Sequence, residues 1–334
     1  MKKQGKRTVF LERPPFIISN AAVVGPKEAE GPLGQEFDYK FTDSMMGEKT
    51  WEKAESKLQK MAVETALQKA ALSPKEIDLI FAGDLLNQCI ASSFDIRDLS
   101  IPFIGLYGAC STMALSLINA SVFVAANGAK NAVSVTSSHF CSAERQYRFP
   151  LEYGGVRTPT SQWTVTGSGA AVLGYNGSGP TIKSFTVGKI IDLGVTDANN
   201  MGAAMAPAAA DTIKSFLEDT NTAPCDYDMI FTGDLGQVGT DLLYEILSRD
   251  GIDIKGYHKD CGNMIFDIEK QDVHAGGSGC GCSASVLCSH ILNAMRQGSM
   301  KNILFCATGA LMSPTSSQQG ESIPSIAHLV NIAL

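Results

Sequence analysis

Three short motifs occur twice in this 334-residue chain, in the same order both times. Each copy has an apolar strand pattern that ends in Gly-Asp-Leu, then a turn of small residues before a helix, then Lys-Asn before a second apolar strand. The pairs are IDLIFAGDLLNQ (77–88) with YDMIFTGDLGQVG (227–239), GACSTMALSLINA (108–120) with GCGCSASVLCSHILNA (279–294), and NGAKNAVSVTSSH (127–139) with QGSMKNILFCATGA (297–310). The conserved order predicts a duplicated α/β unit, and hence two related halves.

Helix patterns separate the predicted strands. Residues 50–72 carry apolar side chains at helical spacing and stop before Pro74, and residues 208–220 form the matching segment of the second copy. Strands that alternate with helices predict mostly parallel sheets with helices on their faces. Glycine, serine and proline cluster at 175–180, which predicts a first half of residues 1–177 and a second half of residues 178–334.

The composition argues against several classes of protein. The formal net charge is −7 and 18% of the residues are charged, so we expect no basic surface for nucleic acid. No segment has the length and apolar character of a membrane span, and the N-terminal region reaches Pro14 and Pro15 before any long apolar run, unlike a signal peptide. We therefore expect the protein on the cytosolic side.

The chain has nine cysteines, an odd number, spread through apolar segments without paired CxxC motifs. This pattern predicts reduced thiols rather than disulfides. The CGC sequence at 280–282 lacks further ligands at zinc spacing, so we expect neither a metal nor a cofactor.

Cys110 is the most informative cysteine, because it lies in a glycine-containing turn just before a predicted helix starting at Ser111. Unpaired amides at a helix start favour negative charge. That charge can belong to the Cys110 thiolate, which would then accept acyl groups, or to a ligand carboxylate. A cysteine simply packed between helix and strand is the third possibility.

A catalytic thiol needs a base, and two of the five histidines are candidates. His139 ends a predicted strand, where ligands bind in open α/β sheets. His274 precedes a glycine run whose backbone can approach a ligand closely. His258 and His290 are predicted to be a loop residue and a helix residue, respectively.

The duplicated α/β pattern with a GxC turn before a helix resembles the thiolase superfamily, which includes the ketoacyl synthases. The segments GPLGQEFD (31–38), SSHFCSAERQYRFPLEYGG (137–155), TVTGSGAAVL (164–173), MGAAMAPAAADTIK (201–214) and AGGSGCGCSA (275–284) resemble its stage V sporulation protein AD family from endospore-forming bacteria. The likeness extends over nearly the whole chain. It implies a thiolase-like fold, with two duplicated halves whose mostly parallel five-stranded sheets pack in an αβαβα arrangement.

The resemblance also implies a function without established turnover. The family binds dipicolinic acid (pyridine-2,6-dicarboxylate), or its calcium chelate, and supports its movement into the developing spore. Its partners are membrane-embedded stage V sporulation A proteins, which implies a location peripheral to the spore inner membrane. Thiolase-like proteins also form homodimers, and we expect the apolar strand at 131–138 to supply that interface.

Compared with the catalytic pattern of the superfamily, two of three partner positions differ. Cys110 matches the nucleophile. Asp234 stands where condensing enzymes carry a histidine, and Gly277 and Ser278 stand where a histidine or asparagine is expected. Cys306 falls roughly where thiolases keep a second, acid-base cysteine, although a buried strand residue is the simpler interpretation.

A degenerate pocket of this kind is expected to hold a flat dicarboxylate. Backbone and hydroxyl donors would come from the start of the Cys110 helix and from the glycine run, with charge from residues near His139. The expected ligand-binding residues are Cys110, Ser111, His139, Arg145, Asp234, Gly276, Gly277, Ser278 and Ser283, with Arg148 as a second cation and Trp163 as a possible stacking partner. Two alternatives stay open: a Cys110-dependent acyltransferase or condensing enzyme with His139 or His274 as base, and a scaffold that docks on a membrane complex.

Overall fold

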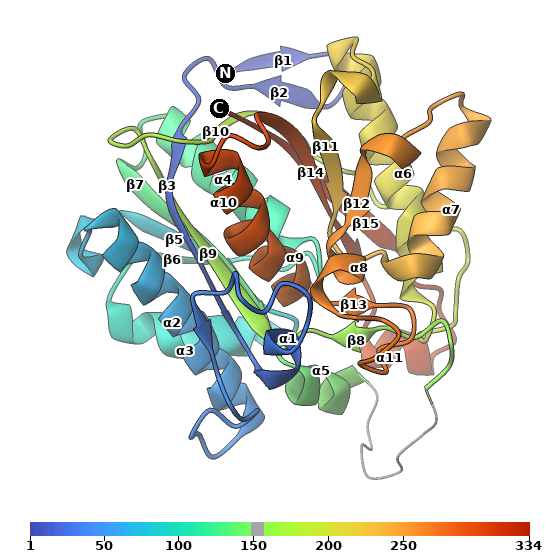
Figure 1. Ribbon diagram of the computed structural model, residues 1–334, viewed down its shortest axis with the longest axis horizontal. Helices are drawn as coiled ribbons and strands as arrows, with labels where there is room; N and C mark the ends of the chain where they lie inside the picture. The colour runs from blue at the N-terminus through green and yellow to red at the C-terminus, as the bar shows by residue number, and fades with distance from the viewer. Residues whose placement is uncertain (148–156) are drawn as a thin grey trace.

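The computed structural model describes residues 1–147 and 157–334 (Figure 1). Within these residues ten strands form one continuous path, which divides into two sheets of five strands, one from each half of the chain, and three short strands pair beside it. The first sheet has the spatial order β6 (Phe103–Gly105), β5 (Leu79–Gly83), β7 (Asn131–Ser138), β9 (Gly167–Gly174) and β3 (Phe16–Val24). The second has the order β12 (His258–Asp260), β11 (Met229–Thr232), β14 (Asn302–Ala310), β15 (Ser325–Ala333) and β10 (Thr181–Thr186).

The two sheets repeat one pattern of strand directions. In the first, β5 is parallel to β6 and β7, and β9 is antiparallel to both β7 and β3. In the second, β11 is parallel to β12 and β14, and β15 is antiparallel to both β14 and β10. Each sheet is therefore parallel except for one reversed strand, which confirms the predicted mostly parallel halves. One residue pair, Thr181 with Phe16, joins the sheets edge to edge.

Helices form three layers around the sheets, as Figure 1 shows. The middle layer contains α4 (Thr112–Ala125) and the continuous segment α9 (Cys280–Val286), η6 (Leu287–Ile291) and α10 (Leu292–Arg296). The outer layers contain α2 (Trp51–Ala70) with α3 (Ile90–Leu99), and α6 (Met201–Thr220) with α7 (Gly236–Arg249). Because α4 packs against strands of both sheets, apolar residues surround it, as is typical of a central helix. The expected αβαβα arrangement is thus confirmed.

Two predicted helices compare differently with the structure. α2 agrees with the segment predicted at 50–72, and the hydroxyl of Thr50 caps it by accepting the amide of Lys53. α6 begins at Met201, seven residues earlier than the predicted 208, because the Asn200 side chain caps the helix there and Pro207 is accommodated inside it.

The predicted dimer strand is wrong. β7 lies inside the first sheet, because β5 pairs with one of its edges and β9 with the other. Its apolar character reflects burial in a sheet covered on both faces. The edge strand of this sheet is β6.

The remaining elements are short. The helices are α1 (Pro26–Ala29), α5 (Phe140–Tyr147), α8 (Cys261–Ile265) and α11 (Pro314–Gln318). The strands are β1 (Lys2–Gln4), β2 (Thr8–Phe10), β4 (Tyr39–Lys40), β8 (Trp163–Thr164) and β13 (Gly277–Ser278). Of these, α5, β8 and β13 help to build the site described next.

Candidate functional site

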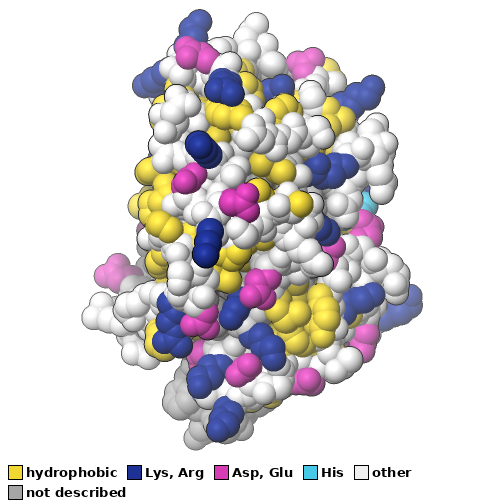
Figure 2. All heavy atoms as spheres, turned by 90° about the vertical axis from the view of Figure 1, so that its left-hand side faces the viewer, with side chains coloured by type: hydrophobic (Ala, Val, Ile, Leu, Met, Phe, Trp, Pro, Cys, Tyr) yellow, Lys and Arg dark blue, Asp and Glu magenta, His cyan; other side chains and the backbone are white. Residues whose placement is uncertain are grey.

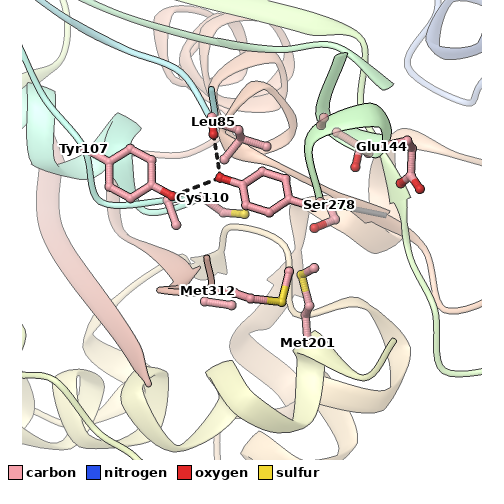
Figure 3. A pocket seen from close by; sticks show the side chains of 12 residues that line it. Leu85, Tyr107, Cys110, Glu144, Met201, Ser278 and Met312 are labelled. Carbon is pink, nitrogen blue, oxygen red and sulfur yellow. Dashed lines mark hydrogen bonds between the residues drawn. The ribbon is translucent and has the colours of Figure 1, made fainter. Parts of the chain in front are cut away.

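A small cavity lies beside Cys110, where segments of both halves meet (Figure 3). Its volume of about 40 Å³ is room for roughly three water molecules, at about 10–15 Å³ each. The lining residues are Leu85, Tyr107, Ala109, Cys110, Ala143, Glu144, Tyr147, Thr164, Met201, Ser278, Ala310 and Met312. Most of these side chains are apolar or aromatic, which is the usual make-up of a small-molecule site.

Cys110 lies in the tight turn that enters α4. Ala109 before it has a φ of 49°, in the left-handed region that non-glycine residues rarely adopt. The amides of Ser111 and Thr112 donate to the carbonyls of Gly108 and Ala109, at 3.1 and 3.2 Å. The expectation that these amides wait unpaired for an anion is therefore wrong, because the turn itself supplies their acceptors. The Ser111 hydroxyl also donates to the Gly108 carbonyl and does not line the cavity.

Asp234, just after β11, lies fully buried behind the thiol. Its carboxyl accepts hydrogen bonds from the Thr308 hydroxyl at 2.8 Å, the Gly279 amide at 2.8 Å and the Ser278 hydroxyl at 3.1 Å, and it also accepts the Cys110 thiol. Burial raises the pKa of Asp234, while these four donors act in the opposite direction. Burial and the nearby Asp234 carboxylate raise the pKa of the Cys110 thiol well above its usual range. This environment favours the neutral thiol.

Asp260 fixes the turn that carries Asp234. It accepts the amides of Leu235 and Gly236, at 2.9 and 3.0 Å, and the Thr232 hydroxyl at 2.6 Å. Since Thr232 donates to Asp260, its oxygen accepts from Nε2 of His258, 2.8 Å away, and Nδ1 of the same ring lies 2.9 Å from the Tyr244 hydroxyl. Burial lowers the pKa of His258 to about 4 and raises that of Asp260 to about 7. His258 is thus a buried structural residue, not the loop residue predicted.

Most backbone groups of the glycine run already have hydrogen-bond partners within the protein. The Gly276 amide donates to the Val273 carbonyl at 3.2 Å, and the Gly277 carbonyl accepts the side-chain amide of Gln162 at 2.8 Å. β13 pairs in parallel with β8. Of the two residues of β13, Ser278 lines the cavity and Gly277 does not. Ser283 is buried inside α9, where its hydroxyl donates to the Cys280 carbonyl, and it does not line the cavity.

The predicted polar partners His139 and Arg145 lie away from the cavity. His139 is fully buried, with Nε2 2.7 Å from the Ser44 carbonyl and Nδ1 accepting the Cys141 amide, so its ring is neutral and both nitrogens are occupied. Arg145 forms an ion pair with Glu52 and does not line the cavity. Arg148 lies outside the described residues.

The other predicted candidates are engaged elsewhere. Trp163 stacks on Phe140 with ring centroids 3.8 Å apart, and Lys27 Nζ lies 4.2 Å from its centroid, so the indole is not available to a ligand in the cavity. His274 Nε2 lies 3.2 Å from the Asp272 carboxylate and does not line the cavity. Cys306 is buried in the core beneath α6, where burial raises its pKa to about 12.

Sequence reasoning missed the cavity walls. Tyr107, Tyr147, Met201 and Met312 form them, and Figure 3 shows Tyr107 and the two methionines around Cys110. The Tyr147 hydroxyl donates to the Leu85 carbonyl at 2.6 Å. Glu144 adds a carboxyl group to the lining. No local pattern marks these residues, because they meet only through the packing of α5, α6 and the loop after β14.

Two further observations concern metal ions and membranes. Among residues 1–147 and 157–334, no three His, Cys, Asp or Glu side chains are grouped so that they could hold a metal ion. In the same part of the chain, no helix combines the length and apolar character needed to cross a bilayer.

The fold resembles that of several condensing and thiolytic enzymes. A 3-oxoacyl-[acyl-carrier-protein] synthase III from Aquifex aeolicus is 14% identical, with a TM-score of 0.57 over 96% of this chain and 100% of that chain. An OleA variant from Xanthomonas campestris is 13% identical, with a TM-score of 0.61 over 98% and 99%. The human mitochondrial 3-ketoacyl-CoA thiolase is 12% identical, with a TM-score of 0.60 over 98% and 99%. At these identities the likeness shows the thiolase-like fold alone.

The sequence comparisons are more specific. The family model of stage V sporulation protein AD matches residues 5–333. Stage V sporulation protein AD of Bacillus subtilis is 48% identical over 328 residues, which cover 98% of this chain and 97% of the relative. The chain is therefore a sporulation protein with a thiolase-like fold, and it belongs to the stage V sporulation protein AD family.

Proposed function

We propose that this protein binds dipicolinic acid in the cavity beside Cys110 without turning it over, and so supports its uptake into the developing endospore and its release at germination. Membership of the sporulation family supports the biological setting. The proposal of binding without turnover rests on the buried Asp234 carboxylate behind the Cys110 thiol, because this carboxylate disfavours thiolate formation. No histidine is among the described residues that line this cavity.

The cavity walls suit a flat aromatic ligand. Tyr107 and Tyr147 present rings, and Met201 and Met312 present flexible thioethers, which pack well against aromatic faces. Ser278 and Thr164 add hydroxyl groups to the lining. The present volume is too small for a pyridine dicarboxylate, so binding requires the mouth to widen. The methionine side chains can change conformation at the lowest cost in free energy, because each has three rotatable bonds.

The charge of the lining favours one form of the ligand. Glu144 lines the cavity, and Asp234 lies behind Cys110 without lining it, so one carboxyl group faces a bound anion and a second lies close to it. No Lys or Arg is among the described residues lining the cavity. The calcium chelate of dipicolinate carries its own neutralising cation, and it fits this environment better than the free dianion.

One observation favours the alternative, an acyltransferase of the condensing-enzyme type. The Gly279 amide and the Ser278 hydroxyl also approach the Cys110 sulfur and act to lower its pKa. Such donors are what a nucleophilic thiolate needs. This second candidate predicts an acyl group on Cys110 after incubation with an acyl-CoA.

The family setting extends to partners and location. We propose that the protein acts at the spore inner membrane with the membrane-embedded stage V sporulation A proteins, and that it forms a homodimer. The outer edge of β6 supports the dimer, because no strand within residues 1–147 and 157–334 pairs with that edge. The described exposed hydrophobic side chains on and near β6 are Phe94, Phe103, Tyr107 and Phe123. Figure 2 shows that hydrophobic side chains gather between charged ones on the face that carries α2 and α3.

Isothermal titration with dipicolinate, alone and with equimolar calcium, tests the binding. We expect heat in both titrations and tighter binding of the chelate. Cys110→Phe fills the cavity and is expected to abolish the heat, whereas Cys225→Phe, the same change at an exposed cysteine, should leave it intact. Circular dichroism checks that both variants fold. Equal binding by the two variants would place the ligand elsewhere, and acylated Cys110 after exposure of the wild type to acetyl-CoA would favour the acyltransferase.

A further inference from the structure

Cys110 keeps most of the surroundings of a reactive thiol. It lies in a strained turn at the start of α4, it lines a cavity, and two donors, the Gly279 amide and the Ser278 hydroxyl, approach its sulfur. Strained turns and convergent donors are features of nucleophile sites. The turn, the cavity and these two donors therefore do not by themselves explain an inert thiol.

The same two donors also reach Asp234. Gly279 donates its amide to Oδ2 at 2.8 Å, and Ser278 donates its hydroxyl to the same oxygen at 3.1 Å. An amide can only donate, so Oδ2 acts as an acceptor here. Thr308 donates to the other oxygen, Oδ1, at 2.8 Å. The Cys110 thiol is a fourth donor to this carboxyl group. This pattern of donors matches a carboxylate rather than a carboxylic acid.

A thiolate at Cys110 would thus face two penalties. It would lie next to a buried carboxylate in a site with low dielectric, where like charges repel strongly. It would also compete with that carboxylate for the same amide and hydroxyl.

We propose that Asp234 holds Cys110 in the thiol form by repelling a thiolate and by taking the Gly279 and Ser278 donors, so that this one carboxylate makes the cavity a binding site rather than an acyl-accepting site. The inference deepens the proposed function, because it names the residue that separates binding from chemistry. It predicts that an isosteric neutral residue at position 234 releases the reactivity of Cys110.

The repeat supplies a matched control. Asp84 follows β5 as Asp234 follows β11, and it is also buried. It accepts the amides of Leu86 and Ser92, both at 2.9 Å, so these hydrogen bonds lie within the first half of the protein. Asp84→Asn removes the same charge as Asp234→Asn from a carboxyl group that makes no hydrogen bond with Cys110.

The test is alkylation of the whole protein by iodoacetamide between pH 6 and 9, read peptide by peptide by mass spectrometry. In this reaction the thiolate sulfur forms a bond to carbon and iodide leaves. We expect Asp234→Asn to accelerate labelling of Cys110 at least about tenfold at pH 8, the effect of about one pKa unit, and to shift its pH profile downward. Exposed Cys225 is the internal standard and should react equally in all variants.

A second arm uses acetyl-CoA. The Cys110 sulfur takes the acetyl group, the thioester bond of the donor breaks, and CoA leaves as its thiol. We expect acetylated Cys110 in Asp234→Asn but not in wild type or Asp84→Asn. If Asp234→Asn does not fold, Asp234→Ala is tested in the same way, with circular dichroism as the check.

If Cys110 in the position-234 variants is labelled no faster than in the wild type, the inference is overturned. It is also overturned if Asp84→Asn accelerates the labelling of Cys110 equally. Dipicolinate titration of the wild type is independent of these rates. A wild type that fails to bind therefore refutes the proposed function, while the labelling result still decides the role of Asp234.

Discussion

The Tyr147 hydroxyl lies 2.6 Å from the Leu85 carbonyl and 3.0 Å from the Tyr107 hydroxyl. A hydroxyl has one proton, and the Leu85 carbonyl can only accept, so Tyr147 donates to Leu85 and accepts from Tyr107. This short chain of hydrogen bonds ties α5 to the turn after β5 at the mouth of the cavity (Figure 3).

The two tyrosines should therefore differ in their contribution to stability. Tyr147→Phe removes both hydrogen bonds from a largely buried hydroxyl and is expected to lower the free energy of unfolding by about 1 kcal/mol. Tyr107→Phe removes one bond at a side chain that is 47% exposed, and its effect should stay within about 0.5 kcal/mol. Urea unfolding measures both variants. An equal loss in Tyr107→Phe would show that the bond between the two tyrosines, not the bond to Leu85, provides the stability.

Stability should fall as the pH rises from 6.5 to 8.5. Burial raises the pKa of Glu28 and Asp260 to about 7 and that of Glu55 to about 8, so the folded state binds more protons than the unfolded state in this range. The free energy of unfolding then decreases with pH. His258 and His328, whose pKa values burial lowers to about 4, oppose this trend only below their unfolded value near 6.5.

Glu55 gives this prediction a matched pair of variants. Glu55→Gln keeps the hydrogen-bonding shape of the protonated acid and should reduce the loss between pH 6.5 and 8.5 by about 1–2 kcal/mol. Glu64→Gln, at an exposed position of the same helix α2, should leave the loss unchanged. Guanidinium unfolding at both pH values provides the comparison. A wild type that is more stable at pH 8.5 than at pH 6.5 would show that these carboxyl groups are ionised in the folded state.

The sequence predicted the fold better than the site, for a physical reason. The duplicated halves were visible because apolar strands and the Gly-Asp and Lys-Asn turns are local signals that packing preserves. Cys110, Ser278 and Asp234 were singled out by comparison with the catalytic positions of the thiolase superfamily, and the structure places them together. No sequence pattern could show which acceptor each hydrogen-bond donor would find. The Gly279 amide donates to Asp234, and the Ser111 amide donates to the Gly108 carbonyl. The aromatic and thioether walls arise only from tertiary packing.

Thr308 should contribute to stability through its bond with Asp234. Its hydroxyl donates to Oδ1 of a fully buried carboxyl group at 2.8 Å. Thr308→Val keeps the shape of the side chain but removes this donor, and we expect it to lower the free energy of unfolding by about 1–3 kcal/mol. Thr308→Ser keeps the hydroxyl and should lose less. Thermal and urea unfolding compare the two, and a Thr308→Ser variant as unstable as Thr308→Val would mean that packing, not the hydrogen bond, matters here.

The edge of β6 gives the last prediction, which concerns the proposed homodimer. Phe103 begins this edge strand with its side chain 38% exposed, and a charge there should prevent a second copy from adding its strand. Phe103→Glu is therefore expected to convert a dimer to a monomer in sedimentation equilibrium at micromolar concentration. Tyr257→Glu introduces the same charge at a side chain of similar exposure, 37%, in the second half of the chain, and should leave the dimer intact. A monomeric wild type, or a Phe103→Glu variant that remains dimeric, would rule out this edge as the interface.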